Sequence, residues 1–257
     1  MASARPEFDQ LAELYDETRG GEQRGDDFAA LVARHLGDPG AGPVFEVGVG
    51  TGVVALGLAK RGYPIFGLDV SRPMLKRGRE RLGPVVILGD AMDLPAAAHG
   101  IARAVSVWVV QSVPDPIRLF AEVARVLRPG GRYVVCTTQR SAEDDEIGHI
   151  IQRMADAVDS CRLGKRPRSV TVDQVLEWSG LAGFRGEVHA YERSFVSSPE
   201  LELDAIARRS WPALRELDDD AAYEATKPAI DALQKLPPGD TERKGFVDVI
   251  VLESAVA

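Results

Sequence analysis

The chain has 257 residues, of which 45% are hydrophobic and 27% charged, and these proportions are ordinary for a soluble globular protein. Its length suffices for one α/β domain with a modest insertion. The formal net charge of −8 argues against a general nucleic-acid binder, which would carry a basic face.

The first part of the chain predicts two helices, a strand and a third helix. Apolar residues at helical spacing predict one helix over residues 8–19 and a second over residues 22–36. Residues 44–47 form a short apolar strand that contains one acidic residue, Glu46. The strand passes through glycines at alternate positions into the third helix. These glycines are Gly48, Gly50 and Gly52.

From residue 64 onward, strands alternate with amphipathic helices. The predicted strands cover residues 64–68, 85–88, 104–110 and 133–136, and the predicted helices cover residues 72–82 and 116–127. Nearly continuous apolar strands that alternate with helices indicate a parallel sheet covered on both faces. Ligands bind such a sheet at the carboxyl ends of its strands. The polar residues expected at those ends are Asp69, Asp90 and Gln111.

The pattern changes after residue 140. Helices are predicted over residues 143–158, 171–180 and much of 199–236, and strands over residues 187–196 and 246–252. The helical stretches 141–169 and 198–238 are expected to be additions that form a lid over the ligand face. The chain, residues 1–257, is therefore expected to be a single domain.

Cysteine usage and hydropathy bear on the location of the protein. Cys136 and Cys161 are too few for a disulfide framework, so the expected location is the cytoplasm. The N-terminus is not followed by an apolar run, which argues against a signal peptide. No stretch approaches the roughly 18 apolar residues of a membrane span. The four histidines and two cysteines show no metal-ligand spacing, so no metal is expected.

The glycine stretch allows two nucleotide-binding interpretations. A dinucleotide fingerprint has the form Gly-x-Gly-x-x-Gly, but Val53 stands where its third glycine would fall. Glu46 would also repel a pyrophosphate, whereas a ligand with a cationic group near the glycines would explain this carboxylate. S-adenosylmethionine fits, because its amino acid end and sulfonium are cationic and its adenosine offers a ribose diol.

Four segments, in order and at matching spacing, resemble motifs of the class I S-adenosylmethionine-dependent methyltransferases. They are Phe45-Glu46-Val47-Gly48-Val49-Gly50-Thr51-Gly52, Gly67-Leu68-Asp69-Val70-Ser71 with Met74-Leu75, Gly89-Asp90-Ala91-Met92-Asp93-Leu94-Pro95, and Val126-Leu127-Arg128-Pro129-Gly130-Gly131-Arg132-Tyr133. The best match is to the small-molecule methyltransferases of type 11, over roughly residues 8 to 138. The resemblance implies a Rossmann-like, doubly wound α/β fold with a mostly parallel, seven-stranded sheet. It also implies S-adenosylmethionine as cofactor and S-adenosylhomocysteine as product.

The resemblance implies roles in binding the adenosine. Asp69 would accept hydrogen bonds from both ribose hydroxyls. Val70 and Met74 would pack on the adenine, with methionine as an adaptable surface. Asp90 would accept from the adenine amino group, and the N–H of Ala91 would donate to a ring nitrogen.

The resemblance also implies roles at the amino acid end of the cofactor. The three glycines would pass beneath this end, with Glu46 helping to orient its ammonium group. Tyr15 and Arg19 match a segment that closes over the cofactor in relatives, and Arg19 is a candidate partner of the cofactor carboxylate. Residues 1–37 would therefore form N-terminal helices that cover the cofactor.

Structural alternatives accompany these roles. Glu46 could be a structural charge paired with a helix N-terminus, and Asp69 could cap the next helix. Met74 could be an ordinary core residue. Tyr15 and Arg19 could form a helix end with a surface cation.

Catalytic residues are thinly marked. Methyl transfer from a sulfonium is an in-line displacement that depends on how the acceptor is held. It needs a general base only when the acceptor must lose a proton. The candidates are Gln111, at a position where many relatives carry a histidine, and His149, which could also be a solvated helix residue.

The sequence therefore predicts an S-adenosylmethionine-dependent methyltransferase that acts on a small molecule, such as a specialised metabolite, or on a short peptide. No nucleic acid and no membrane is expected as a partner. One alternative is a nicotinamide-dependent oxidoreductase on a Rossmann fold, and another is a non-catalytic module that binds the cofactor. No pattern encodes the acceptor, its reacting atom (O, N or C) or the oligomeric state.

Overall fold

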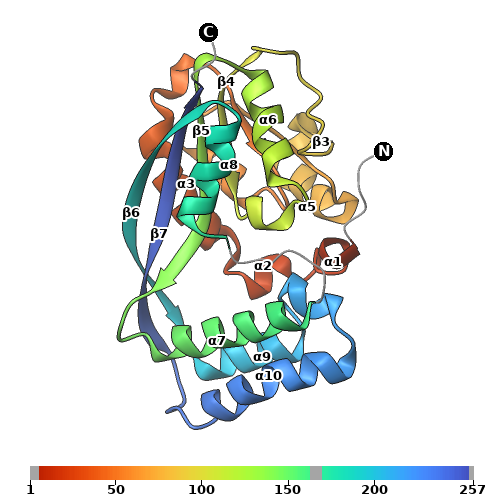
Figure 1. Cartoon of the computed structure of the whole chain (residues 1–257), viewed down its shortest axis with the longest axis vertical. Coiled ribbons are helices and arrows are strands. Elements are labelled where there is room, and N and C mark those ends of the chain that lie inside the picture. The colour runs from red at the N-terminus through yellow and green to blue at the C-terminus, as the bar shows by residue number, and fades with distance from the viewer. Residues whose placement is uncertain (1–5, 163–169, 255–257) are drawn as a thin grey trace. The chain divides into compact units, whose positions relative to one another are not determined.

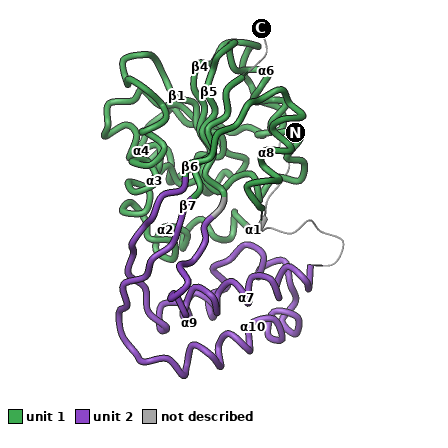
Figure 2. Tube along the Cα trace, turned by 60° about the vertical axis from the view of Figure 1, so that its left-hand side comes forward, with its two compact units in different colours: residues 1–138, 170–189, 248–257 green, residues 139–169, 190–247 purple. Residues whose placement is uncertain are grey.

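The computed structural model describes residues 6–162 and 170–254, with the side chains of residues 6, 7 and 138 left aside. The chain divides into two compact units (Figure 2). Unit 1 comprises residues 1–138, 170–189 and 248–257, and unit 2 comprises residues 139–169 and 190–247. Each unit is therefore built from separate stretches of the sequence.

Within the described ranges, seven strands form one sheet in the order β3-β2-β1-β4-β5-β7-β6 (Figure 1). The strands are β1 (Val44–Val47), β2 (Ile65–Asp69), β3 (Val86–Leu88), β4 (Ile101–Val107), β5 (Leu127–Ser141), β6 (Phe184–Ser197) and β7 (Thr241–Ser254). β1 pairs in parallel with β2 and β4, β2 with β3, and β4 with β5. The predicted doubly wound, Rossmann-like α/β sheet is confirmed, and its order reverses beside β1.

Helices cover both faces of the sheet in unit 1. They are α1 (Pro6–Asp9), α2 (Tyr15–Thr18), α3 (Gly21–Leu36), α4 (Val53–Lys60), α5 (Arg72–Leu82), α6 (Pro116–Val126) and α8 (Val172–Leu181), with short 3-10 turns η1 (Pro39–Ala41), η2 (Gly83–Val85) and η3 (Val110–Ser112). Phe45 and Val47 of β1 pack in the core beneath α6 and α8, whereas α4 and α5 enclose a smaller cluster around Val49. Because side chains alternate along a strand, Glu46 points away from the α6 face.

Local sequence explains where the helices begin. Ser71 caps α5, because its Oγ accepts a hydrogen bond from the Met74 N–H at 3.3 Å. Asp115 caps α6 in the same way through the N–H of Arg118. Thr171 and Gln174 form a capping box at the start of α8.

Several elements differ from the sequence prediction. The helix expected over residues 8–19 is two single turns, because the chain between them makes hydrogen bonds from Leu11 N to Phe8 O and from Leu14 N to Leu11 O. β4 ends at Val107 and not at residue 110, because Trp108 has a left-handed φ of 61° that cannot continue a strand. β5 is far longer than residues 133–136.

Unit 2 has a hydrophobic core of its own. Its helices are α7 (Glu146–Cys161), α9 (Pro199–Ala207) and α10 (Asp219–Leu233), with the 3-10 turn η4 (Pro212–Glu216), and the ends of β5, β6 and β7 complete the unit. Ile150, Met154 and Leu233 are among its buried residues. Arg243 also donates to both carboxylate oxygens of the buried Asp145, at 2.8 and 3.0 Å. These segments correspond largely to the expected lid, whose residues 163–169 lie outside the described ranges, and both the lid and the single domain stay predictions.

Two features are absent from the described residues. None of their helices combines the length and the apolar character that crossing a membrane requires. Nor do they bring three or more His, Cys, Asp or Glu side chains together in an arrangement that could hold a metal ion.

Candidate functional site

The glycine turn between β1 and α4 has a backbone that other residues would not adopt without strain. Gly48, Gly50 and Gly52 have φ values of 77°, 55° and 81°, in the left-handed region. A Cβ atom at position 48 would collide with the side chain of Val109, and one at position 52 would lie 2.8 Å from Leu82 Cδ1. Position 50 faces open space. The turn therefore packs closely at its first and third glycines and is open at the middle one.

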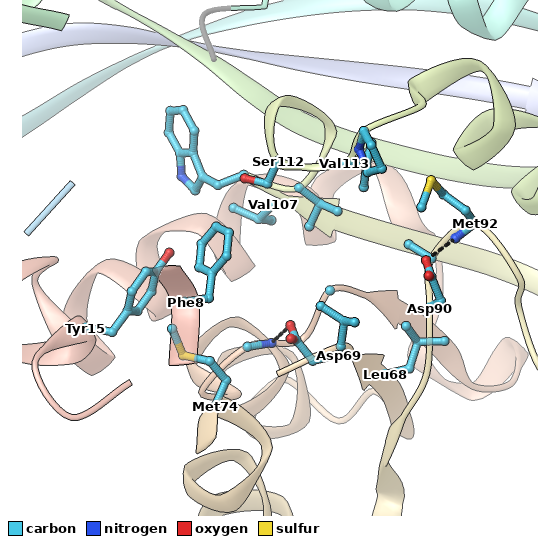
Figure 3. Close-up of a pocket in the computed structure, with 17 residues that line it drawn as sticks. Phe8, Tyr15, Leu68, Asp69, Met74, Asp90, Met92, Val107, Ser112 and Val113 are labelled. Carbon is cyan, nitrogen blue, oxygen red and sulfur yellow. Dashed lines mark hydrogen bonds between the residues drawn. The ribbon is translucent and has the colours of Figure 1, made fainter. Parts of the chain in front are cut away.

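A first cavity, cavity A, lies at the carboxyl ends of β2 and β4 (Figure 3). Its walls come from α1, α2, the glycine turn, the end of β2, the start of α5, the loop after β3 and the segment after β4. Its lining residues include Phe8, Tyr15, Gly48, Gly50, Asp69, Val70, Met74, Asp90, Ala91, Met92, Trp108, Val109 and Ser112. The cavity thus combines two carboxylates with a largely apolar lining.

Asp69 ends β2 in the wall of cavity A and holds the glycine turn. Its Oδ2 accepts a hydrogen bond from the Gly50 N–H at 2.9 Å, and its Oδ1 accepts one from the Ser71 N–H at 2.8 Å. Burial raises the pKa of Asp69, although these N–H groups and that of Val70 oppose the rise. The same carboxylate thus fixes the turn and lines the cavity.

Asp90 and Ala91 follow β3 in a tight turn. Asp90 Oδ1 accepts a hydrogen bond from the Met92 N–H at 2.9 Å, shown dashed in Figure 3. A backbone bond from Asp93 N to Asp90 O, 3.0 Å long, closes the turn. This arrangement places a carboxylate and a buried alanine side by side on the cavity wall.

A second cavity, cavity B, shares Tyr15, Gly48, Gly50, Val107 and Trp108 with cavity A. It is also lined by Glu46, which is only 2% exposed. Glu46 Oε2 is buried without a hydrogen-bond partner among the residues that the structure describes. Burial raises the pKa of Glu46 well above its usual value, and the nearby charge of Asp69 adds to this effect.

Cations and an aromatic ring also line cavity B. Arg19 and Arg24 are both in its wall. The guanidinium of Arg24 lies over the rings of Phe28 and Trp108, 5.3 Å from each centroid, in cation–π geometry. The indole Nε1 of Trp108 is buried and lacks a hydrogen-bond partner within the described ranges. Cavity B therefore offers a carboxyl group and guanidinium groups, which complement the two charges of an amino acid.

The structure gathers ten of the eleven predicted cofactor-binding residues in the walls of these cavities. Cavity A has Tyr15, Gly48, Gly50, Asp69, Val70, Met74, Asp90 and Ala91, and cavity B has Tyr15, Arg19, Glu46, Gly48 and Gly50. Gly52 is the exception, since it serves the turn and lines neither cavity. The binding roles of these residues stay predictions.

The two catalytic candidates lie elsewhere. Gln111 is in η3, where its Oε1 accepts a hydrogen bond from the Thr137 hydroxyl, and it is not among the lining residues of either cavity. His149 is exposed on α7 of unit 2. A catalytic role for either residue also stays a prediction.

Sequence reasoning missed Arg24 and Trp108. Arg24 is one cation in an amphipathic helix, and nothing in its neighbourhood distinguishes it from a solvated residue. Trp108 was expected inside a strand, whereas its left-handed backbone ends β4. An aromatic residue at the end of an apolar strand is the one signal that points to it.

Comparison with known proteins identifies the part of the chain that carries most of this site. Residues 45–135 match a family model described as "Methyltransferase domain". The match runs from β1 into β5 and includes Glu46, the glycine turn, Asp69 and Asp90. The resemblance to type 11 methyltransferases is therefore confirmed.

Individual relatives agree with this match. The chain is 36% identical over 148 residues to the ubiquinone/menaquinone biosynthesis C-methyltransferase of Desulfotalea psychrophila, which covers 53% of this chain and 58% of that protein. The chain thus spans somewhat more than half the length of this curated relative. A possible histamine N-methyltransferase of Thermotoga maritima, described as SAM-dependent, shares the fold at 20% identity and a TM-score of 0.59, over 98% of this chain and 100% of that one.

The same fold also occurs in a protein described by another reaction. SpnF, a 4+2 cyclase, is 21% identical with a TM-score of 0.61, over 98% of this chain and 95% of that one. At this level of identity the likeness concerns the fold alone. Function has to be argued from the site.

Proposed function

We propose, from the match of residues 45–135 to a methyltransferase family model, that the chain is an S-adenosylmethionine-dependent methyltransferase acting on a small molecule. The observation that carries the proposal is Glu46 Oε2, which has no hydrogen-bond partner in the described part of the chain, in a cavity also lined by Arg19 and Arg24. A buried carboxyl oxygen without a partner is costly. A cationic ligand group would pair with its ionised form, whereas a pyrophosphate brings no positive charge to offset the cost of ionising it.

The residues present fit S-adenosylmethionine. In cavity B, Glu46 would hold the ammonium group, and Arg19 or Arg24 the carboxylate of the amino acid end. In cavity A, Asp69 would hold the ribose, while Val70, Met74, Asp90 and the N–H of Ala91 would hold the adenine. When bound, this cofactor supplies an electrophilic methyl group on its sulfonium.

The contribution of the chain to the reaction is mainly to hold and orient its ligands. The glycine turn leaves space for a ligand beside Gly50. The amide of Gln111 can orient an acceptor, and the imidazole of His149 can take a proton from an acceptor that must lose one. We propose these two as the residues to test for roles in catalysis.

The acceptor is proposed only as a class. The relatives include a protein named for methylation in quinone biosynthesis and one named as a possible histamine methyltransferase. A small molecule, such as a specialised metabolite, or a short peptide is the acceptor class we propose, with unit 2 as the lid that shapes its site.

Two other functions are distinguished by experiment. A nicotinamide-dependent oxidoreductase would bind a dinucleotide, which Glu46 disfavours. A non-catalytic module would bind the cofactor and transfer no methyl group to any acceptor. Calorimetry on the purified chain should detect binding of S-adenosylhomocysteine and no binding of NAD⁺. Binding of NAD⁺ alone would contradict the proposal.

Substitution of Asp69 tests the binding mode. Asp69→Ala should weaken binding of S-adenosylhomocysteine by about 1.5–3 kcal/mol, the scale of a charge-assisted hydrogen bond, or roughly ten- to a hundredfold in Kd. Asp69→Asn, which keeps one acceptor oxygen for the turn, should lose less. Asp93→Ala is the control, because Asp93 is exposed and lines neither cavity. Equal affinity of all these variants would show that the ribose contact is misassigned.

A further inference from the structure

Asp16 on the short helix α2 lines cavity B and joins three elements at its wall. The Thr51 hydroxyl donates a hydrogen bond to Asp16 Oδ1 at 2.6 Å, and Arg81 Nη2 of α5 donates to Asp16 Oδ2 at 2.6 Å. Arg81 Nη1 donates in turn to the Thr51 carbonyl oxygen at 2.7 Å. Asp16, Thr51 and Arg81 thus form a closed set of charge-assisted contacts, which we call the Asp16 clasp.

Asp16 and Thr51 of the clasp line cavity B, next to other residues that line the cavities. Tyr15, next to Asp16, lines both cavities, and Arg19, one helical turn further along, lines cavity B. Thr51 stands between Gly50 and Gly52 in the glycine turn. A displacement of Asp16 would therefore move Tyr15 and Arg19 relative to the turn.

Helix α2 cannot hold this position by itself. It has four residues, none of them buried, and a single helical turn is unstable in isolation because its nucleation is costly. The burial that secures this part of the chain lies upstream, where Leu11 and Ala12 pack against Met74. The clasp holds α2 itself in place. Its ion pair is largely shielded from solvent, because the side chains of Asp16 and Arg81 are only 13% and 19% exposed.

We propose that Asp16 is a positioning residue for the cofactor: through Thr51 and Arg81 it holds Tyr15 and Arg19 in place beside the glycine turn. This inference rests on the proposed function. Without the clasp, the free energy of binding must also order the α2 segment, which lowers affinity. Loss of the clasp should therefore weaken cofactor binding, in addition to any loss of fold stability.

A second aspartate provides a matched control. Asp26 on α3 makes a bidentate ion pair with Arg61, at the end of α4. Like Asp16, it joins a helix near the N-terminus to a later element through an arginine. Unlike Asp16, Asp26 lines neither cavity. Asp26→Ala therefore reports what the loss of such a pair does to the fold.

The test measures S-adenosylhomocysteine affinity by calorimetry and amide hydrogen exchange of residues 13–20. Asp16→Ala should raise Kd about tenfold or more, on the scale of 1.4 kcal/mol for each factor of ten, and should speed exchange of this segment in the free protein. Thr51→Val should show the same changes to a smaller extent. The double variant should bind about as well as Asp16→Ala alone, because both substitutions break one network. Asp26→Ala should change Kd by less than about twofold. Asp26 shares no partner with the clasp, and substitutions at such independent sites have little effect on one another.

The inference is overturned when Asp16→Ala binds S-adenosylhomocysteine as tightly as Asp26→Ala, or when its 13–20 segment exchanges as slowly as in the unaltered protein. When Asp16→Ala does not fold, Asp16→Asn and Thr51→Val are judged by the same two comparisons. Failure of the unaltered chain to bind S-adenosylhomocysteine refutes the proposed function and this inference together. Normal binding by the unaltered chain and by Asp16→Ala refutes the inference alone.

Discussion

Glu46 places a carboxyl group in β1, whose other residues are two valines and a phenylalanine. Burial, and then the charge of Asp69, raise its pKa well above the usual value. The free protein therefore holds a proton on Glu46 at pH values where an exposed glutamate is ionised. A ligand ammonium group in cavity B would favour the ionised form and release that proton.

Proton release on cofactor binding is the resulting prediction. Calorimetry near pH 6 in buffers of different ionisation enthalpy should show that the unaltered chain releases protons when it binds S-adenosylmethionine. Glu46→Gln, which cannot ionise, should release fewer and bind more weakly. Equal proton release in both proteins would mean that Glu46 is not the group that titrates.

The raised pKa also fixes the sign of a stability effect. The native state holds the Glu46 proton more firmly than the unfolded state, whose glutamate pKa is about 4.3. The contribution of Glu46 to stability is therefore complete below that pH and is lost as pH rises through the native pKa. Urea unfolding should show that the unaltered chain loses more stability between pH 5 and pH 8 than Glu46→Gln does.

At the scale of an element, the glycine turn depends on packing as well as on backbone freedom. Gly48→Ala should destabilise the fold by about 1–2 kcal/mol for the left-handed backbone and by about 1–3 kcal/mol more for the collision with Val109. Urea unfolding measures both. Gly83→Ala is the control, because Gly83 has a similar φ of 73° and no atom near its missing Cβ.

A double variant separates the two contributions. Val109→Ala removes the methyl groups that the new Cβ would meet. The double variant Gly48→Ala/Val109→Ala should therefore regain the stability lost to the collision and keep the loss that comes from the left-handed backbone. Additive effects of the two substitutions would show that strain in the backbone alone accounts for the loss.

At the scale of the whole molecule, the cofactor cavities and the second hydrophobic core belong to different units. Every residue that lines cavity A or cavity B belongs to unit 1. Unit 2 packs α7, α9 and α10 around its own apolar residues. The proposed division is that unit 1 binds the cofactor and unit 2 shapes the site of the acceptor.

Hydrogen exchange tests this division. S-adenosylhomocysteine alone should slow amide exchange around residues 15–24, 46–52, 69–74 and 90–92, because a ligand stabilises what it contacts. Exchange in α7, α9 and α10 should be unchanged until an acceptor is added. Asp69→Ala is the control: at the same concentration of S-adenosylhomocysteine, its weaker binding should slow exchange in these segments less. Protection of α7 or α10 by S-adenosylhomocysteine alone would contradict the division.

Much of the fold and part of the site follow from local sequence. Apolar strands alternating with amphipathic helices indicate a parallel sheet, and the ends of such strands meet at one edge. For this reason the pattern of residues alone predicts that the glycine turn, Asp69, Asp90 and Gln111 lie near one another. The structure places all but Gln111 in the wall of cavity A. The glycines identify the turn because only their backbone adopts its left-handed conformations.

Only the tertiary structure decided what surrounds those residues. Arg24 reaches cavity B because α3 lies beside the glycine turn, and Asp16 reaches Arg81 across 65 positions of sequence. No periodicity records such contacts, since they depend on how helices pack and not on neighbours along the chain. The sequence by itself determined the sheet, the turn and the acidic residues at its strand ends. Packing determined the two cavities, the second role of Asp69 in holding Gly50, and the clasp that holds α2.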